Sequence, residues 1–403
     1  MTDFPFGFQL PGGGGSDPVD PAQMQAFLAQ LQQVFASPSD GPVNWNLARQ
    51  LAEQTAREGD RSLTAAERDA VGEALRLADL WLDPVTSLPS GVTAPAAWSR
   101  LEWIGHTMDT WRTLCDPVAG RVVGAMTQLV PDELRAQLGP MAGMLGSIGG
   151  VMFGGQVGQG IGQLSTEVLG TSDIGLPLGP AGTAALLPAN LAAFAAGLER
   201  PEEEVRLYVA LREAAHQRLF GHVPWLRSHL VNAVDAYARG ISVDRQAIED
   251  AMSQVDPANP ESIQEALAGG LFRPEDTPEQ QAALNRLETA LALVEGWVAH
   301  VVEAATAGRL PGAPALAEAF RRRRAAGGPA EQTFATLVGL ELRPRRLREA
   351  TALWTALTEH RGAEGRDEVW GHPDLLPSSD DLDDPEGFAR RTAEVEMPGL
   401  DDL

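Results

Sequence analysis

The 403-residue sequence contains no lysine, so all 31 of its Lys/Arg residues are arginines. Chemistry that needs a lysine amine, such as Schiff-base formation, is therefore excluded. Cys115 is the only cysteine, which excludes an intramolecular disulfide and a zinc site built from several thiolates. Acidic residues number 55, and the net charge of −24 argues against a nucleic-acid backbone or an anionic membrane surface as the main partner.

Signals for export are also missing from the start of the sequence. Residues 1–20 are rich in glycine and proline, and they contain neither the basic stretch nor the apolar stretch of a secretory signal peptide. We therefore expect a soluble cytoplasmic protein in which residues 1–20 form a disordered leader. The apolar fraction of 44% is enough for a hydrophobic core in the rest of the chain.

One long segment lacks charge altogether. No charged residue lies between Arg135 and Glu167, and a glycine recurs at every fourth position from Gly146 to Gly162. At about 100° per residue, this spacing lays the glycines along one face of a helix. Three glutamines and so much glycine make the segment a poor membrane span, so it predicts a glycine-zipper helix in the protein core, closely crossed by other helices. The sequence has no Gly-x-x-x-x-Gly-Lys motif, so nucleotide binding is not expected.

The rest of the pattern is typical of a mainly α protein with a small β element. Residues 21–135 are expected to form an N-terminal helical region. Glycine and proline interrupt short extended pieces after residue 172, so any β-structure is expected there, before a helix that begins near Pro188. Residues 136–377 form the second region, and residues 378–403 are expected to form an acidic, solvated tail.

The basic residues cluster in one place, around Arg321–Arg324. In so acidic a chain, such a cluster is typical of a face that neutralises nearby acids or docks an acidic segment. We therefore expect it to pair with acids of its own face or with the acidic tail, rather than to bind nucleic acid.

One predicted helix, over 202–220, carries a spacing close to a known zinc motif. A zinc peptidase has His-Glu-x-x-His on a helix, and this chain has Arg212, Glu213 and His216 in the corresponding order. On a helical wheel Arg212 and His216 fall within an apolar stripe, with Glu213 at its edge. A buried arginine needs a charged, hydrogen-bonded partner, so the helix carries a polar site into the interior. The pattern alone leaves open whether that site is functional or a structural ion pair.

A second predicted helix, over 278–306, supplies the best-placed partner. Its apolar stripe passes through Leu291 and Val298, and Glu295 lies next to that stripe. Glu295 could be the third ligand of a zinc ion, supplied by a separate helix, or it could be the counter-ion of Arg212.

Three segments together resemble the actinobacterial zincin-like metallopeptidase family: "LREAAHQRLFGHVPWL", "ALVEGWVAHVV" and "ALTEHRGAEGRDEVWGHPDLLPSSDDLDDPEGF". The similarity extends over about residues 20–388 and includes "SDIGLPLGPAG". Members of this family are described as hydrolases or zinc-dependent metalloproteases, and some are linked by name to deazaflavin-coenzyme biosynthesis. The resemblance implies a mostly helical, zincin-like fold, whose zincin-like part is the region 136–377.

The resemblance also implies a role for each residue of the site. Glu213 matches the general base that would activate a zinc-bound water, His216 matches the second zinc ligand, and Glu295 matches the third. Arg212 occupies the place of the first ligand. Its fixed positive charge repels Zn²⁺, and its guanidinium can bind Glu295 in place of the metal.

This replacement favours a catalytically degenerate protein without bound metal, which acts as a binding or scaffold module. Its partner is an unknown protein or peptide, with no nucleic acid and no membrane insertion. The alternative is an active zinc-dependent peptidase or amidohydrolase with Glu213 as the base. A metal-free hydrolase that uses Glu213 and His216 as an acid–base pair is a third hypothesis.

Overall fold

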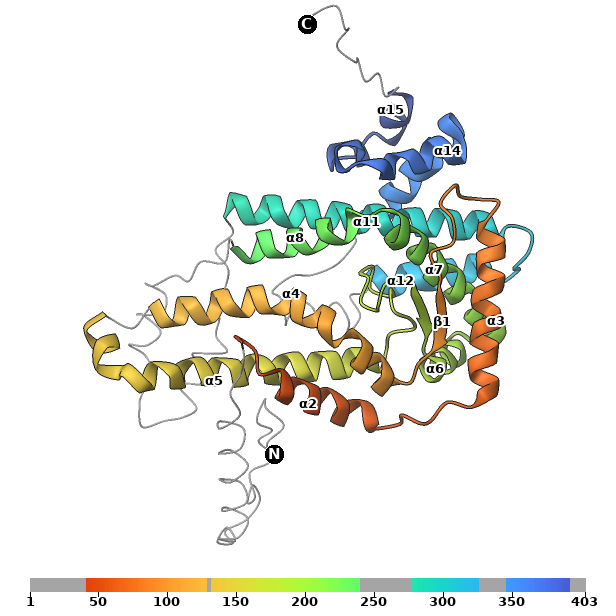
Figure 1. Cartoon of the computed structure of the whole chain (residues 1–403). Helices are drawn as coiled ribbons and strands as arrows, with labels where there is room; N and C mark the ends of the chain where they lie inside the picture. Colours follow the sequence, from red (N-terminus) through yellow and green to blue (C-terminus); the bar gives the residue numbers. More distant parts are fainter. Residues whose placement is uncertain (1–40, 129–131, 240–276, 326–345, 392–403) are drawn as a thin grey trace, which may run out of the picture.

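The computed structural model of the chain describes residues 41–128, 132–239, 277–325 and 346–391. These residues form a mainly helical protein with one small sheet, as the sequence predicts (Figure 1). In chain order the elements are α2 (Trp45–Arg57), α3 (Ala65–Leu82), β1 (Ala94–Ala97), α4 (Arg100–Gln128), α5 (Asp132–Ser165), β2 (Thr183–Leu186), α6 (Pro188–Leu198), α7 (Glu202–His222), α8 (Leu226–Arg239), α11 (Pro278–Thr306), α12 (Ala313–Ala325), α14 (Leu347–Asp367), the 3₁₀ turns η1 (Glu368–Gly371), η2 (Pro373–Leu375) and η3 (Asp380–Leu382), and α15 (Pro385–Arg390). The predicted leader, residues 1–20, lies outside the described residues.

The helices pack as a stack of neighbours. Figure 1 shows the order from α2 and α5 through α4, α8 and α11 to α14 and α15, and each successive pair is in contact. Helix α7 lies to one side of this stack, where it contacts α3, α11 and α12. The position of α7 brings it against elements that are far apart in the sequence.

Local signals define where the main helices begin. At α3, the Thr64 hydroxyl accepts a hydrogen bond from the Glu67 amide at 3.2 Å, and the Glu67 carboxylate accepts one from the Thr64 amide at 2.8 Å. Helix α11 begins with the same reciprocal arrangement between Thr277 and Gln280. Because these caps satisfy backbone donors that a helix leaves unpaired, they fix the helix starts from sequence alone.

The sheet consists of two parallel strands, β1 and β2, paired from Ala94 opposite Thr183 to Ala97 opposite Leu186. Strand β2 lies in the segment where β-structure was expected, and α6 begins at Pro188. Strand β1 was not predicted, because its sequence, Ala-Pro-Ala-Ala, carries no alternating pattern. Its extended form depends on a partner almost 90 residues away.

The glycine-rich face of α5 packs directly on α2. A Cβ atom added to Gly154 would lie 2.5 Å from the Asn44 carbonyl oxygen, and one added to Gly158 would lie 2.6 Å from the Ala48 carbonyl oxygen. Glycine therefore lets the two backbones approach more closely than any side chain would permit. Gly150 belongs to the same contact, because its carbonyl accepts the Asn44 amide at 2.8 Å.

We expect Gly158→Ala to destabilise the protein by about 1–3 kcal/mol, since overpacking forces α2 and α5 apart. Gly105 in α4 is the matched control, because an added Cβ there meets no atom within 4 Å. Gly105→Ala should be neutral or stabilising by up to about 1 kcal/mol, the gain in helix propensity. Urea unfolding of both variants measures the difference, and equal stabilities would contradict the close packing.

The start of the predicted acidic tail is folded. Residues 378–391 form η3 and α15 against α14, with Leu382 and Ala389 buried. Arg361 of α14 donates to the carbonyl oxygens of Phe388 and Ala389, both at 2.9 Å. An acidic composition therefore did not distinguish a solvated tail from a segment held by arginines of the preceding helix.

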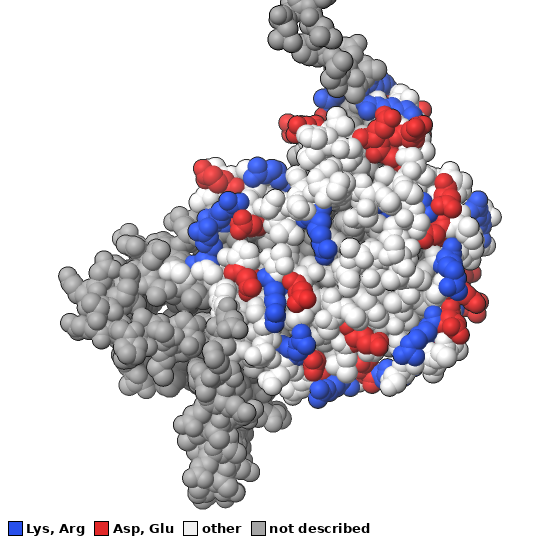
Figure 2. All heavy atoms as spheres, viewed as in Figure 1, with Lys and Arg blue, Asp and Glu red and all other residues white. Residues whose placement is uncertain are grey.

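The described surface mixes both signs of charge. On the face shown in Figure 2, acidic and basic side chains are interspersed around a broad uncharged area, so the net negative charge does not form a single patch there. In the described part of the chain, no helix combines the length and the apolar character needed to cross a bilayer.

Candidate functional site

Helix α7 is buried on nearly all sides along its centre, where each residue from Tyr208 to Leu219 is at most 6% exposed. Helix α3 covers one side, and α11 and α12 cover another. The polar residues of α7 consequently lie in the protein interior, where each must find a partner.

Arg212 meets Glu295 inside the protein. Arg212 Nη2 donates to Glu295 Oε2 at 2.6 Å, and the two residues are only 6% and 1% exposed. The guanidinium of Arg212 also lies over the ring of Phe320 of α12, with its Cζ atom 4.9 Å from the ring centroid. The pairing satisfies a charge that could not otherwise remain buried.

A second arginine reaches the same carboxylate. Arg324, near the end of α12, donates from Nη2 to Glu295 Oε1 at 2.7 Å. Burial raises the pKa of the Glu295 carboxyl, but the guanidinium groups of Arg324 and Arg212 outweigh that effect and hold the pKa below its ordinary value. Glu295 is therefore ionised and bonded through both oxygens.

His216 completes this cluster of four residues, Arg212, His216, Glu295 and Arg324, which we call the charged cluster. The His216 ring faces the Arg212 carbonyl oxygen through Nδ1 at 2.8 Å and Glu295 Oε1 through Nε2 at 3.0 Å. Both partners are acceptors, since the carboxylate is ionised. The ring can form both hydrogen bonds only when each nitrogen carries a proton.

Glu213 does not join the charged cluster, because its carboxylate bonds instead to Thr171 and Ser172. Its oxygens accept hydrogen bonds from the hydroxyl of Thr171, from the amide of Ser172 at 3.0 Å, from the hydroxyl of Ser172 at 3.2 Å, and from Gln217 Nε2 at 3.0 Å. Burial raises the pKa of the Glu213 carboxyl, although the hydrogen bond from Thr171 acts in the opposite direction. Each of its oxygens is thus engaged by a neighbouring donor.

The segment 168–179, between α5 and β2, wraps around both carboxylates. A Cβ atom on Gly170 would lie 2.6 Å from Glu213 Oε2, and one on Gly175 would lie 3.1 Å from Glu295 Oε1. Gly175 also has a φ of +80°, which favours glycine. Two glycines therefore allow the backbone of this loop to close over the site.

Asp173 of the same loop binds the end of α12. Its Oδ2 accepts from Arg323 Nη1 at 3.0 Å, and its carbonyl oxygen accepts from Arg324. Burial raises the pKa of Asp173, but Arg323 and Arg324 outweigh it, so the pKa is lowered. The loop and α12 are thus tied to each other as well as to Glu295.

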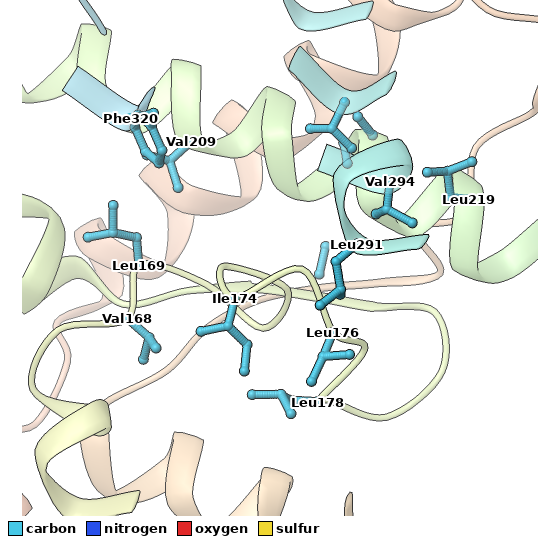
Figure 3. Close-up of a cluster of buried hydrophobic side chains, with 14 of the residues drawn as sticks. Val168, Leu169, Ile174, Leu176, Leu178, Val209, Leu219, Leu291, Val294 and Phe320 are labelled. Carbon is cyan, nitrogen blue, oxygen red and sulfur yellow. The ribbon is translucent and has the colours of Figure 1, made fainter. Parts of the chain in front are cut away.

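Apolar side chains surround these charges. Figure 3 shows apolar side chains of the loop 168–179 together with others from α7, α11 and α12. They are Val168, Leu169, Ile174, Leu176, Leu178, Val209, Leu219, Leu291, Val294 and Phe320. All ten are at most 8% exposed, so the charged cluster lies in a low-dielectric interior where its ion pairs are poorly screened.

Sequence reasoning identified Arg212, His216 and Glu295, which the structure brings together, but it missed Arg324. Within the basic run, Arg321 and Arg322 pair with Glu318 of their own helix, as expected of a self-neutralising face. Arg324 instead points inward. The available signal was helical spacing, because Arg324 lies four residues after the buried Phe320.

The side chains are arranged to hold elements together. Among the residues that the structure describes, no three His, Cys, Asp or Glu side chains gather closely enough to hold a metal ion. The charged cluster instead connects α7, α11 and α12 through one carboxylate, and Asp173 attaches the loop.

Comparisons with known proteins agree on the architecture. The model of a family described as zincin-like metallopeptidase matches residues 43–389. A crystal structure described as a "putative hydrolase with a novel fold", from Chloroflexus aurantiacus, aligns with a TM-score of 0.58 at 21% identity, over 86% of this chain and 97% of that one. At that identity the likeness concerns the fold alone. No curated protein matches the chain.

Proposed function

We propose that this chain, which belongs to the zincin-like metallopeptidase family, is a catalytically degenerate member with a binding or scaffold role. The observation that carries the proposal is the contact of Arg212 with Glu295 at 2.6 Å. Arg212 stands where the motif of a zinc peptidase has its first histidine. In its place the chain has a cation that binds the residue proposed as the third ligand.

The charged cluster does not fit a zinc ion. Zinc needs neutral imidazole and free carboxylate lone pairs directed at one point. Here His216 Nε2 is directed at Glu295 Oε1, and the carboxylate oxygens are bonded to Arg212 and Arg324. Arginine cannot lose its proton to make room for a cation.

The surroundings of Glu213 also support a degenerate site. A general base needs an oxygen within hydrogen-bond reach of the water that it activates. Glu213 accepts from Thr171, Ser172 and Gln217, and Gly170 packs against its Oε2 atom. These contacts support a structural role for the carboxylate, in which it holds the loop 168–179 against α7.

The second candidate function is a zinc-dependent peptidase or amidohydrolase with Glu213 as the base. One observation favours it: His216 Nε2 and Glu295 Oε1 are 3.0 Å apart, a separation compatible with two ligands of one ion. That reading requires Arg212 and Arg324 to leave Glu295 and a third ligand to take their place.

Metal analysis separates the two candidates. We expect the full chain, produced with added zinc and purified without chelators, to retain much less than about one zinc per chain. It should also hydrolyse no peptide substrate, with or without added zinc. Stoichiometric zinc that disappears in His216→Ala, but persists when the exposed His360 is replaced by alanine, would overturn the proposal in favour of the peptidase.

A further inference from the structure

A separate cavity of about 380 Å³ lies where α11 turns into α12. The connection between these two helices is at the right of Figure 1. Its walls come from the last turn of α11, the turn at 307–311 and the first half of α12, and Tyr208 of α7 also lines it. The volume falls within the range of about 300–1,000 Å³ that is usual for small-molecule sites.

Most of the lining is apolar and short, including Leu310, Pro311, Pro314 and Ala317. Two proline rings and small side chains give a wall with little rotamer freedom, so little side-chain entropy would be lost when a ligand binds. Such a wall suits a compact apolar group.

Two opposite charges interrupt this apolar lining. Glu303 is supplied by α11 and Arg321 by α12. In the described part of the chain, no side chain bonds to the Glu303 carboxylate, and Arg321 uses only Nε, at 3.1 Å, for Glu318. One acid and one base are thus available at the rim of a single cavity.

Tyr208 connects the cavity to the protein interior. It is 3% exposed, and its ring centroid lies 5.5 Å from that of Phe320, whose ring carries the guanidinium of Arg212. Burial raises the pKa of the Tyr208 hydroxyl, so it remains a neutral donor and acceptor. A ligand in the cavity would therefore change the surroundings of Tyr208.

We propose that this cavity binds a small zwitterion with a short apolar side chain, of the class of an amino acid or dipeptide. Its amine pairs with Glu303, its carboxylate pairs with Arg321, and its side chain lies against the proline and alanine wall. A ligand with a single charge would engage only one of the two protein charges. The inference does not depend on whether the charged cluster binds zinc.

The chain's two tyrosines, Tyr208 and Tyr237, allow a direct test. Full-length protein labelled with 3-fluorotyrosine should give two ¹⁹F resonances, which Tyr208→Phe assigns. The dipeptide Ala-Leu is expected to shift the Tyr208 resonance saturably and to leave that of Tyr237 in place. N-acetyl-Ala-Leu and Ala-Leu amide should each bind at least about tenfold more weakly, because each lacks one charge-assisted hydrogen bond.

Two variants test which residue binds the amine of the ligand and which binds its carboxylate. Glu303→Gln should weaken the binding of Ala-Leu about tenfold but leave the binding of N-acetyl-Ala-Leu unchanged. Arg321→Gln should weaken the binding of Ala-Leu about tenfold but leave the binding of Ala-Leu amide unchanged. Glu53→Gln on α2, remote from the cavity, should change neither. Absence of a saturable Tyr208 shift up to about 10 mM, or equal binding of all three peptides, would overturn the proposal.

Discussion

Replacing Glu295 by glutamine is expected to lower the free energy of unfolding by about 3–5 kcal/mol, the usual cost of leaving a buried charge without its partner. Glu295 accepts from Arg212 at 2.6 Å and from Arg324 at 2.7 Å. The variant would bury two guanidinium groups against a neutral amide. Its amide nitrogen would also face donors where the carboxylate offered an acceptor.

The measurement is urea unfolding of the full chain, with Glu53→Gln as the matched control. Glu53 pairs with Arg57 on the surface, so its replacement should cost less than about 1 kcal/mol. Adding Arg324→Gln to Glu295→Gln removes one of the unpaired charges and should recover part of the loss. This double variant keeps the test informative even if Glu295→Gln alone fails to fold.

The cost should also depend on pH. Because the folded-state pKa of Glu295 is lowered, its ionisation contributes stability above the unfolded pKa of about 4.3, and this contribution is lost as pH falls through the folded value. The difference between wild type and Glu295→Gln should therefore be largest near neutral pH and should narrow below about pH 4. A pH-independent difference no larger than that of Glu53→Gln would show that the charged cluster contributes nothing to stability.

The second large effect is a gain of metal binding. Arg212→His restores the spacing His-Glu-x-x-His on α7, and Arg324→Gln removes the other cation from Glu295. We expect the double variant to retain about one zinc per chain after dialysis, whereas the wild type retains almost none. Arg212→His alone should bind zinc more weakly, because Arg324 still neutralises the carboxylate.

Elemental analysis and the shift of the thermal midpoint with added zinc measure this gain. Introducing His216→Ala into the double variant should abolish both signals, while His360→Ala should leave them unchanged. If the double variant remains without zinc although it is folded, the two arginines are not what keeps the metal out. The proposal that Arg212 replaced a zinc ligand would then fail.

Local patterns predicted the helices well because their causes are local. The Thr64–Glu67 and Thr277–Gln280 caps lie three residues apart, so the start of α3 and that of α11 can be read directly from the sequence. Helix ends follow less directly from local patterns, and α7 continues two residues past the expected Phe220 to His222. Strand β1 could not be foreseen, because its hydrogen bonds depend on β2.

The site shows the same division. Helical spacing places Arg212 and His216 together on α7, and the rule that a buried arginine needs a partner predicts a carboxylate nearby. The sequence pattern could not show that Glu213 turns away from this pair toward Thr171 and Ser172. These donors lie on a loop whose path is set by two glycines and by the packing of α5 and β2.

By itself, the sequence determined the helices and the burial of α7, because periodicity and caps act over a few residues. Its composition excluded lysine chemistry and a zinc site built from several thiolates. Only the tertiary structure decided which charges meet. Arg324 and Glu295 are 29 residues apart along the chain, on different helices, and their contact exists because α12 folds back along α11 and α7. Once Arg212 and Arg324 are buried, each guanidinium needs an acceptor within hydrogen-bond reach. A single carboxylate in the low-dielectric interior accepts a hydrogen bond from each of them, and its oxygens are then occupied.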